Sequence, residues 1–189
     1  MKKNSSDERG SVPVIIGVII LAIVVFGISY WTYFKYYRLA YTDKTYNFSL
    51  MNRRGWHELP KEEGVYYSLG TSDVPGGKVV STFRISPITR KDDTSITDSS
   101  SFQKICSDLI KEINYTILGW FDVRYSGLEG HVCKSEGKAA DIDRINIFSI
   151  YLLMNPGGTY DYMIFTTYPK GNLVEEAKVN EMLRYFHAD

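Results

Sequence analysis

The chain has 189 residues, with 22 basic and 22 acidic side chains and a formal net charge of zero. The first 40 residues carry five basic and two acidic residues, which leaves 17 basic against 20 acidic residues in the remainder. A remainder with a net charge of −3 has no basic surplus for binding phosphates, so we expect no nucleic-acid partner.

The first element is the apolar stretch 12–33, VPVIIGVIILAIVVFGISYWTY, which contains no charged residue. At a rise of about 1.5 Å per residue, a helix of this length covers about 33 Å and can cross a hydrocarbon core of about 30 Å. Aromatic and basic residues crowd its C-terminal end, as they do at membrane interfaces. We therefore predict a transmembrane anchor at residues 12–34, a short cytoplasmic tail at 1–11 and a juxtamembrane linker at 35–41.

Two alternatives remain open for this stretch. A cleaved signal peptide has a shorter apolar core, of about 7–15 residues, and ends at small residues rather than at bulky aromatic ones. A prepilin-like leader would explain Gly10 before the apolar run, but no glutamate follows it closely. The flanking charges are nearly balanced, and the Met-Lys-Lys start favours a cytoplasmic N-terminus. We expect a single-pass cell-membrane protein whose C-terminal domain is extracytoplasmic.

A globular domain is expected at residues 42–189, and its opening segment is interpreted as strand, turn and strand. Aromatic and polar side chains alternate over residues 46–51, and further strand candidates lie at 65–69 and 79–85. The polar stretch 86–99 is rich in turn-forming residues and is expected to be a mobile loop.

A helix is predicted from Ser100 to about Asn114. Ser100 as the N-cap and Gln103 three residues later form a capping box. The following apolar residues recur at helical spacing, which predicts one apolar face. This face consists of Phe102, Ile105, Cys106, Leu109, Ile110 and Ile113.

Four strand candidates follow this helix, at residues 116–125, 128–133, 142–154 and 160–168. Beyond Asn146, the segment 142–154 is apolar on both alternating sets of side chains, which predicts a sheet covered on both faces. The segment 155–158, Asn-Pro-Gly-Gly, suits a tight turn between the last two strands.

The last predicted element is a helix that begins after Asn172 as its N-cap. Its apolar residues match the helical template at Val179, Met182, Leu183 and Phe186. The order of strands, helix, antiparallel strands and helix predicts an α+β fold, with a mostly antiparallel sheet between helical layers.

The two cysteines, Cys106 and Cys133, both fall in the predicted domain. They can pair in an oxidising compartment, but free cysteines are also commonly buried as small apolar side chains. A disulfide requires Cα atoms within about 7 Å, so the strand of Cys133 would have to lie directly under the helix of Cys106. We expect unpaired cysteines and leave the disulfide open as the alternative.

No catalytic, cofactor or metal constellation stands out. The histidines at positions 57, 131 and 187 are scattered without ligand spacing. His131 and Cys133 can share one strand face, as a Cys/His nucleophile pair would, but ordinary strand positions are the favoured interpretation. The glycines near Lys78 lack the spacing of a phosphate-binding loop. We therefore expect no enzyme, no cofactor and no metal.

The opening segment YNFSLMNRRGW resembles the Y-x-F/I-x-x-P-x-G-W pattern of PsbP-like proteins, relatives of the extrinsic photosystem II subunit and of a yeast nuclear-import factor. The matching residues are Tyr46, Phe48, Gly55 and Trp56, while 52–54 stand where the family usually has a proline. The resemblance covers about residues 42–187 and implies an α/β/α sandwich. It also implies a binding or assembly subunit without a shared catalytic site.

We expect Phe48 and Trp56 to be core residues that anchor the first hairpin. The alternative is a binding lip formed by Arg53, Arg54 and Trp56. The leading hypothesis is a membrane-anchored, non-catalytic binding or assembly module with a protein partner at or near the membrane. The alternative is a small-ligand-binding sensor with a pocket between sheet and helix, and an enzyme ranks third.

Overall fold

The computed structural model describes residues 11–37, 40–73, 77–90, 99–138 and 144–188, without the side chains of 11–15 and 32–37. Residues 1–10 of the predicted tail at 1–11 lie outside the described residues. The chain forms two units, Met1–Leu39 and Ala40–Asp189.

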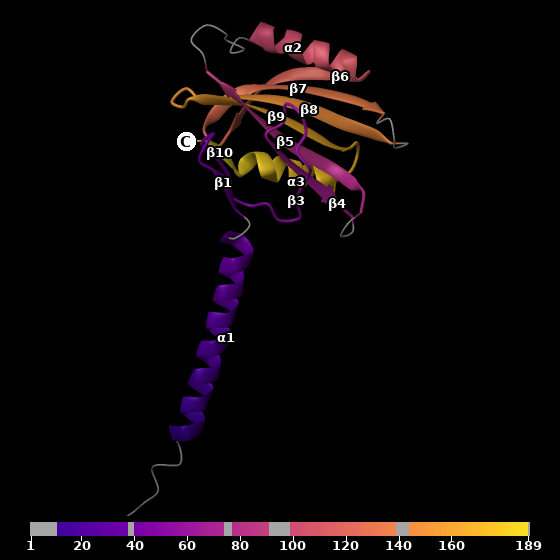
Figure 1. Ribbon diagram of the computed structural model, residues 1–189. Helices are drawn as coiled ribbons and strands as arrows, with labels where there is room; N and C mark the ends of the chain where they lie inside the picture. The colour runs from indigo at the N-terminus through magenta and orange to yellow at the C-terminus, as the bar shows by residue number, and fades with distance from the viewer. Residues whose placement is uncertain (1–10, 38–39, 74–76, 91–98, 139–143, 189) are drawn as a thin grey trace, which may run out of the picture. The chain divides into compact units, whose positions relative to one another are not determined.

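The first unit contains one helix, α1 (Ser11–Tyr37), drawn in indigo in Figure 1. Its described side chains, at 16–31, are exposed and largely apolar. Over the described residues, no helix is both long enough and apolar enough to cross a membrane.

The second unit is built on a seven-stranded sheet in which every pairing is antiparallel. The strand order is β3-β4-β5-β9-β8-β7-β6. The strands are β3 (His57–Glu58), β4 (Tyr67–Ser72), β5 (Val79–Thr89), β6 (Thr116–Tyr125), β7 (Leu128–Lys138), β8 (Ile145–Met154) and β9 (Tyr160–Pro169).

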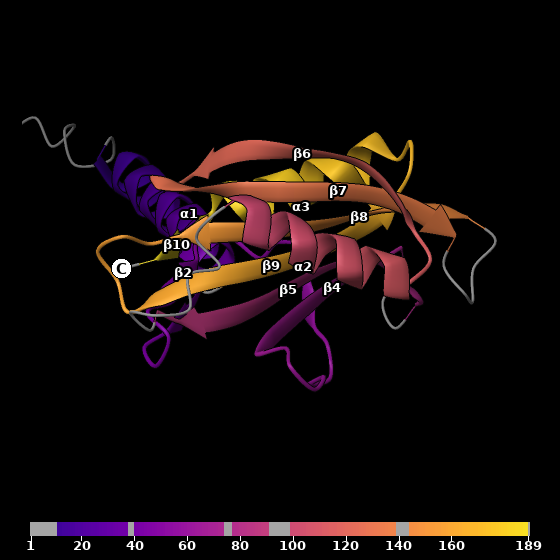
Figure 2. The same cartoon turned by 90° about the horizontal axis from the view of Figure 1, so that it is seen from above.

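Two helices cover the opposite faces of this sheet, α2 (Ser99–Glu112) on one side and α3 (Leu173–Arg184) on the other (Figures 1 and 2). The α+β class with a mostly antiparallel sheet is therefore confirmed. Strand β8 has apolar side chains on both faces of the sheet, so each face has to be buried under a helix. Its residues Ile147, Tyr151 and Leu153 join the core under α3, whereas Ile150 and Leu152 join the core under α2. The apolar pattern on both sides of this strand predicted this arrangement correctly.

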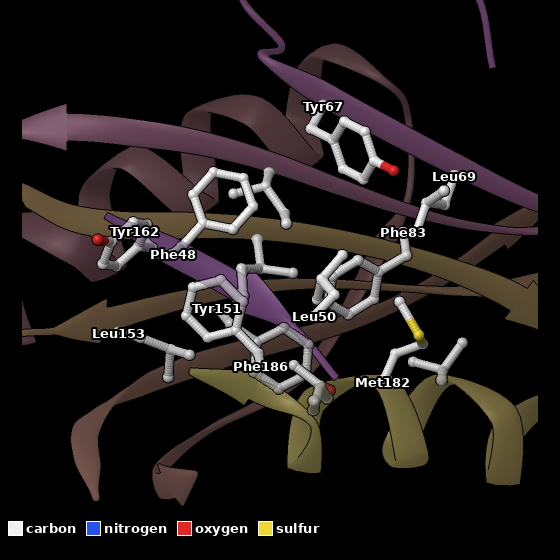
Figure 3. Close-up of a cluster of buried hydrophobic side chains, with 14 of the residues drawn as sticks. Phe48, Leu50, Tyr67, Leu69, Phe83, Tyr151, Leu153, Tyr162, Met182 and Phe186 are labelled. Carbon is white, nitrogen blue, oxygen red and sulfur yellow. The ribbon is translucent and has the colours of Figure 1, made fainter. Parts of the chain in front are cut away.

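The larger core lies between the sheet, α3 and a second, small sheet of order β1-β2-β10. The small sheet consists of β1 (Tyr41–Asp43), β2 (Phe48–Leu50) and β10 (Phe186–Ala188). Figure 3 shows Phe48 and Phe186 among the buried side chains, with Met182 from α3. Phe48 is thus a core residue, as expected. Phe186, expected in the last helix, lies instead in β10, because the helix ends at Arg184 and the chain then pairs with β2.

The start of α3 combines a helix cap with a buried carboxylate. Asn172 is the N-cap, as predicted, and its side chain accepts a hydrogen bond from the Glu175 N–H at 3.2 Å. The Glu175 side chain is 4% exposed and accepts from Thr71 Oγ1 at 2.6 Å, Ser81 Oγ at 2.7 Å and Lys178 Nζ at 2.6 Å. These bonds connect the first turn of α3 to β4 and β5.

Several element boundaries differ from the sequence predictions, and β5 and α2 are examples. Strand β5 continues to Thr89, beyond the predicted end at 85, because its second half pairs with β9 over residues 86–89. Most of the loop expected at 86–99, residues 91–98, lies outside the described residues. Helix α2 begins at Ser99, one residue before the predicted cap, and Gln103 Nε2 donates to Ser99 Oγ at 3.4 Å.

Candidate interaction surface

Strand β6 lies at one end of the strand order, and most of its residues are exposed. Figure 2 shows it at the border of the sheet, beyond β7. One edge of β6 pairs with β7, and within the described residues no strand pairs with the other edge. A ten-residue edge presents unpaired backbone N–H and C=O groups to a partner strand. At the opposite border, β3 has only two residues.

Strand β6 also exposes large apolar side chains. Leu118, Trp120 and Phe121 are 50%, 42% and 52% exposed. Trp120 lies opposite Cys133 and so faces the α2 side, whereas Phe121 lies opposite Val132 and faces the α3 side. The pairing shifts between Ile117 and Gly119, which makes Leu118 the extra residue of a bulge.

Gly119 leaves room for the Phe121 ring. A Cβ atom at position 119 would lie 2.9 Å from Phe121 Cζ, so a larger side chain would displace the ring. The core under α2 does not bury Trp120, because the buried side chains of α2 pack on β7, β8 and β9. We call the exposed residues Leu118, Trp120 and Phe121 of this open strand the β6 surface.

Two hollows adjoin the β6 surface. The larger, of about 450 Å³, is open and is lined by Asp122, Val123, Arg124, Glu129, Gly130, His131 and Met154. The smaller, of about 230 Å³, lies between the first turn of α2 and β6, where it is lined by Ser99, Phe102, Gln103, Trp120, Phe121, Asp122 and His131. Asp122 and His131 line both hollows and are linked through Nδ1 and Oδ1 at 2.8 Å. The Phe102 ring stacks on the imidazole, with 6.0 Å between ring centroids.

Cys106 and Cys133 form a disulfide with a Cα–Cα distance of 6.4 Å. The expectation of unpaired cysteines is therefore wrong. The physical reason is the register of helix and strand, since Cys106 on the buried face of α2 lies directly over Cys133 in β7. The disulfide fixes α2 to the sheet beside the smaller hollow. It also leaves no thiol at Cys133 for a Cys/His nucleophile pair with His131.

The residues of the proposed binding lip, Arg53, Arg54 and Trp56, do not form one surface group. The Arg53 guanidinium is largely buried, forms an ion pair with Glu58 at 2.8 Å and contacts the Tyr67 hydroxyl. Hydrogen bonds that the Glu58 carboxyl accepts from Arg53 and from Tyr67 hold its pKa below the ordinary value. Arg54 is exposed. A binding role for this region stays a prediction.

Trp56 is partly buried and packs against the larger core, so it belongs to the border of the core. The ring packs edge-on against Phe83, with 6.1 Å between centroids. Phe83 itself is fully buried. Trp56 therefore covers the border of the core instead of filling its centre.

Sequence reasoning did not identify the β6 surface. The segment 116–125 was predicted as a strand, but its position at the sheet border depends on the pairing order of distant segments. Trp120 and Phe121 are consecutive and point to opposite faces, so burying both requires that both helical layers reach the border of the sheet. His131 was considered only with Cys133, and its partner Asp122 was missed because the two lie on different strands.

An antiparallel sheet between two helical layers defines the class of this domain, an α+β sandwich without a metal-ligand cluster in its described residues. Among solved structures, cyanobacterial PsbP (CyanoP) from Synechocystis sp. aligns with a TM-score of 0.56 and 11% identity, over 79% of this chain and 91% of that one. LpqN of Mycobacterium tuberculosis aligns with a TM-score of 0.51 and 11% identity, over 74% and 81%. The fold is that of PsbP-like proteins, which confirms the resemblance found in the sequence.

A protein from Bacteroides thetaiotaomicron also aligns, with a TM-score of 0.52 and 17% identity over 79% of this chain. The aligned part is 48% of the Bacteroides chain, so the present chain corresponds to about half of that protein. No protein-family model and no curated protein sequence matches this chain.

Proposed function

We propose that this chain is a membrane-anchored, non-catalytic binding or assembly module that presents its PsbP-like domain outside the cytoplasm to a protein partner. The observation that carries the binding function is the β6 surface, where Trp120 and Phe121 are exposed on an open strand edge. Aromatic residues are enriched in protein interfaces and dominate their binding energies. An open edge additionally allows a partner to add a strand.

Membrane attachment through residues 12–34 is supported by the uncharged stretch 12–33 and by the helical conformation of Ser11–Tyr37. A span requires about 20 residues, and membrane fractionation tests it. The full chain should require detergent for extraction. Recovery of the full chain in the soluble fraction would contradict the anchor.

The extracytoplasmic orientation is supported by the disulfide between Cys106 and Cys133, because disulfides persist mainly in oxidising compartments. Protease added to intact cells should therefore digest the domain. Complete protection of residues 42–189 in intact cells, with digestion after lysis, would reverse the proposed orientation.

The binding function is tested with the double variant Trp120→Ser and Phe121→Ser in the full chain. Chemical cross-linking in native membranes, followed by detergent extraction, should capture a protein partner with the unaltered chain and lose it with this variant. The matched control is Leu173→Ser with Val174→Ser, which removes two exposed apolar side chains from the start of α3. Equal capture by the β6 variant and the control would contradict the proposal.

The binding lip at Arg53, Arg54 and Trp56 is tested in the same assay by Arg54→Ser, which removes an exposed cation without touching the Arg53–Glu58 pair. We expect unchanged capture, because the contacts of Arg53 are internal to the domain. If Arg54→Ser loses the partner while the β6 double variant keeps it, the partner binds at the lip and not at the β6 surface.

The small-ligand alternative is favoured by one observation, the hollow of about 230 Å³ between α2 and the sheet. Most small-molecule pockets are larger, about 300–1,000 Å³, so a ligand here would be small. A small-molecule collection screened by thermal shift would support this alternative if a compound raised the melting temperature and His131→Ala removed the effect. Partner capture without any such compound would favour the protein-binding function.

A further inference from the structure

The open strand β6 has a self-complementary order of side chains. From Phe121 to Tyr125 the strand reads aromatic, acidic, valine, basic and aromatic, with Val123 at the centre. When two such strands pair antiparallel around Val123, each Asp122 lies opposite Arg124 of the second copy. Opposite charges directly across a strand pair stabilise it, whereas like charges destabilise it.

We propose that the partner of the β6 surface is a second copy of this chain, paired antiparallel through β6 with Val123 on the two-fold axis. This inference rests on the proposed binding function of the same surface and identifies the partner that binds there. The contact is isologous, since the same strand serves in both copies, and such two-fold dimers are the commonest symmetric assemblies. The two sheets then form one continuous sheet.

The charged pair is available for this contact. Asp122 has a side chain that is 90% exposed, and it bonds His131 through Oδ1, while Oδ2 accepts no hydrogen bond within the described residues. Arg124 lies 3.9 Å from Glu129, and both side chains are exposed, so water weakens this ion pair. Both Asp122 and Arg124 can therefore turn to a second copy without breaking a buried interaction.

The apolar side chains follow the same register. On the α3 side, Val123 and Tyr125 already pack against the core of their own copy, and the exposed Phe121 would lie opposite Tyr125 of the second copy. On the α2 side, Trp120 would lie diagonal to Arg124 of the second copy, within reach of a cation–π contact. The pairing thus covers both exposed aromatic rings, one on each face.

The limits of the regular strand fit this register. The bulge at Leu118 ends the even pairing on one side, and the turn at Ser126 and Gly127 ends the strand on the other. A register centred on Phe121 would place Asp122 opposite Trp120 of the second copy and would pair no charges. The two registers therefore respond differently to charge reversal.

Charge reversal of the full chain in detergent tests the dimer, with its mass followed by sedimentation over a range of concentrations. Asp122→Arg and Arg124→Asp, each alone, place like charges opposite each other twice per dimer, so each should raise the dimer dissociation constant by about tenfold or more. The double reversal restores opposite charges and should restore the dimer. Glu63→Arg is the control, since it reverses an exposed acidic charge in the turn before β4, near the opposite end of the strand order, and should leave the dimer intact.

Cross-linking gives a second readout. Val123→Cys should form a covalent dimer under mild oxidation, because residue 123 of one copy lies opposite residue 123 of the second copy. Its side chain lies on the sheet face opposite the native disulfide. Leu118→Cys, in the bulge, should give none. A monomeric chain at all concentrations, a double reversal as dissociated as the single ones, or a dimer without the Val123→Cys cross-link would each overturn the proposal.

Failure of this inference differs from failure of the proposed function. If Trp120→Ser with Phe121→Ser abolishes capture of a different protein while the unaltered chain is monomeric, β6 remains a binding surface and the second copy is excluded. If the chain dimerises through α1 alone, the charge reversals leave its mass unchanged and the Val123→Cys cross-link is absent.

Discussion

The substitution Glu175→Gln tests what holds α3 on the sheet. The carboxylate is almost fully buried and accepts hydrogen bonds from Thr71, Ser81 and Lys178. A glutamine has nearly the same size but only one acceptor oxygen, so its NH₂ group must face either the two hydroxyls or the Lys178 ammonium. Hydrogen bonds to charged groups contribute about 1.5–3 kcal/mol each, and we expect the substitution to cost about 2–3 kcal/mol of unfolding free energy.

The measurement is urea unfolding at pH 7 of the Ala40–Asp189 unit, which has its own core and should fold alone. A loss of this size lowers the melting temperature by about 5–10 °C in a domain of this length. The matched control is Glu176→Gln on the next residue. Glu176 is only half-buried and accepts one bond, from the Tyr168 hydroxyl at 3.2 Å, so this change should cost less than about 1 kcal/mol.

The same comparison has a defined pH dependence. Burial alone would raise the pKa of Glu175, but the bonds from Lys178, Thr71 and Ser81 outweigh burial and hold the pKa below its ordinary value of 4.5. A lowered carboxyl pKa stabilises the folded state above the unfolded pKa, and this contribution disappears as pH falls through the folded pKa. The difference between unaltered protein and Glu175→Gln should therefore be constant from pH 7 to about pH 5.5 and shrink below about pH 4.5. A difference under about 0.5 kcal/mol at pH 7 would refute the role of the charged cluster.

Three further predictions concern the remaining contacts of the domain. Cys106→Ser should cost about 3 kcal/mol of unfolding free energy, and the mass of the unreduced protein should be two hydrogens below that of the reduced one; equal masses would exclude the disulfide. Trp56→Ala should cost about 1–2 kcal/mol in urea unfolding, less than a fully buried tryptophan would, because the partly buried ring lies at the border of the core; a loss above about 3 kcal/mol would place it in the centre of the core. Asp43→Asn should lower the pKa of Tyr66 from about 12 toward 10.0, since the hydrogen bond to the Asp43 carboxylate is the main cause of the raised value. NMR titration of the ring protons measures this shift, and an unchanged pKa would show that Asp43 is not its cause.

The parts of the fold that could be predicted are those encoded by local pattern. Asn172 marked the start of α3, and the apolar residues on both faces of 147–153 required helices on both sides of the sheet. The gap between the strand candidates 116–125 and 128–133 falls at the turn of Ser126 and Gly127, where both residues have positive φ values. In each case the signal lies within about ten residues of sequence.

The parts that could not be predicted depend on contacts between distant segments. Strand β10 has three residues, and its pairing with β2 joins the two ends of the domain, so no local periodicity distinguishes it from the end of a helix. The disulfide required the register between α2 and β7, which follows only after β7 is placed between β6 and β8. The exposure of Trp120 likewise follows from strand order and not from the composition of β6.

The two helical layers are held to the sheet by different chemistry, and this difference bears on the β6 surface. Helix α3 is held by apolar packing of Val179, Met182 and Leu183 together with the Glu175 cluster, which depends on pH. Helix α2 buries only Phe102, Cys106 and Ile110, so the disulfide supplies a larger share of its attachment. Reduction should therefore loosen α2 before α3. Because Phe102 stacks on His131, and His131 bonds Asp122, a loosened α2 would also change the position of the acidic side chain that the proposed pairing through β6 uses.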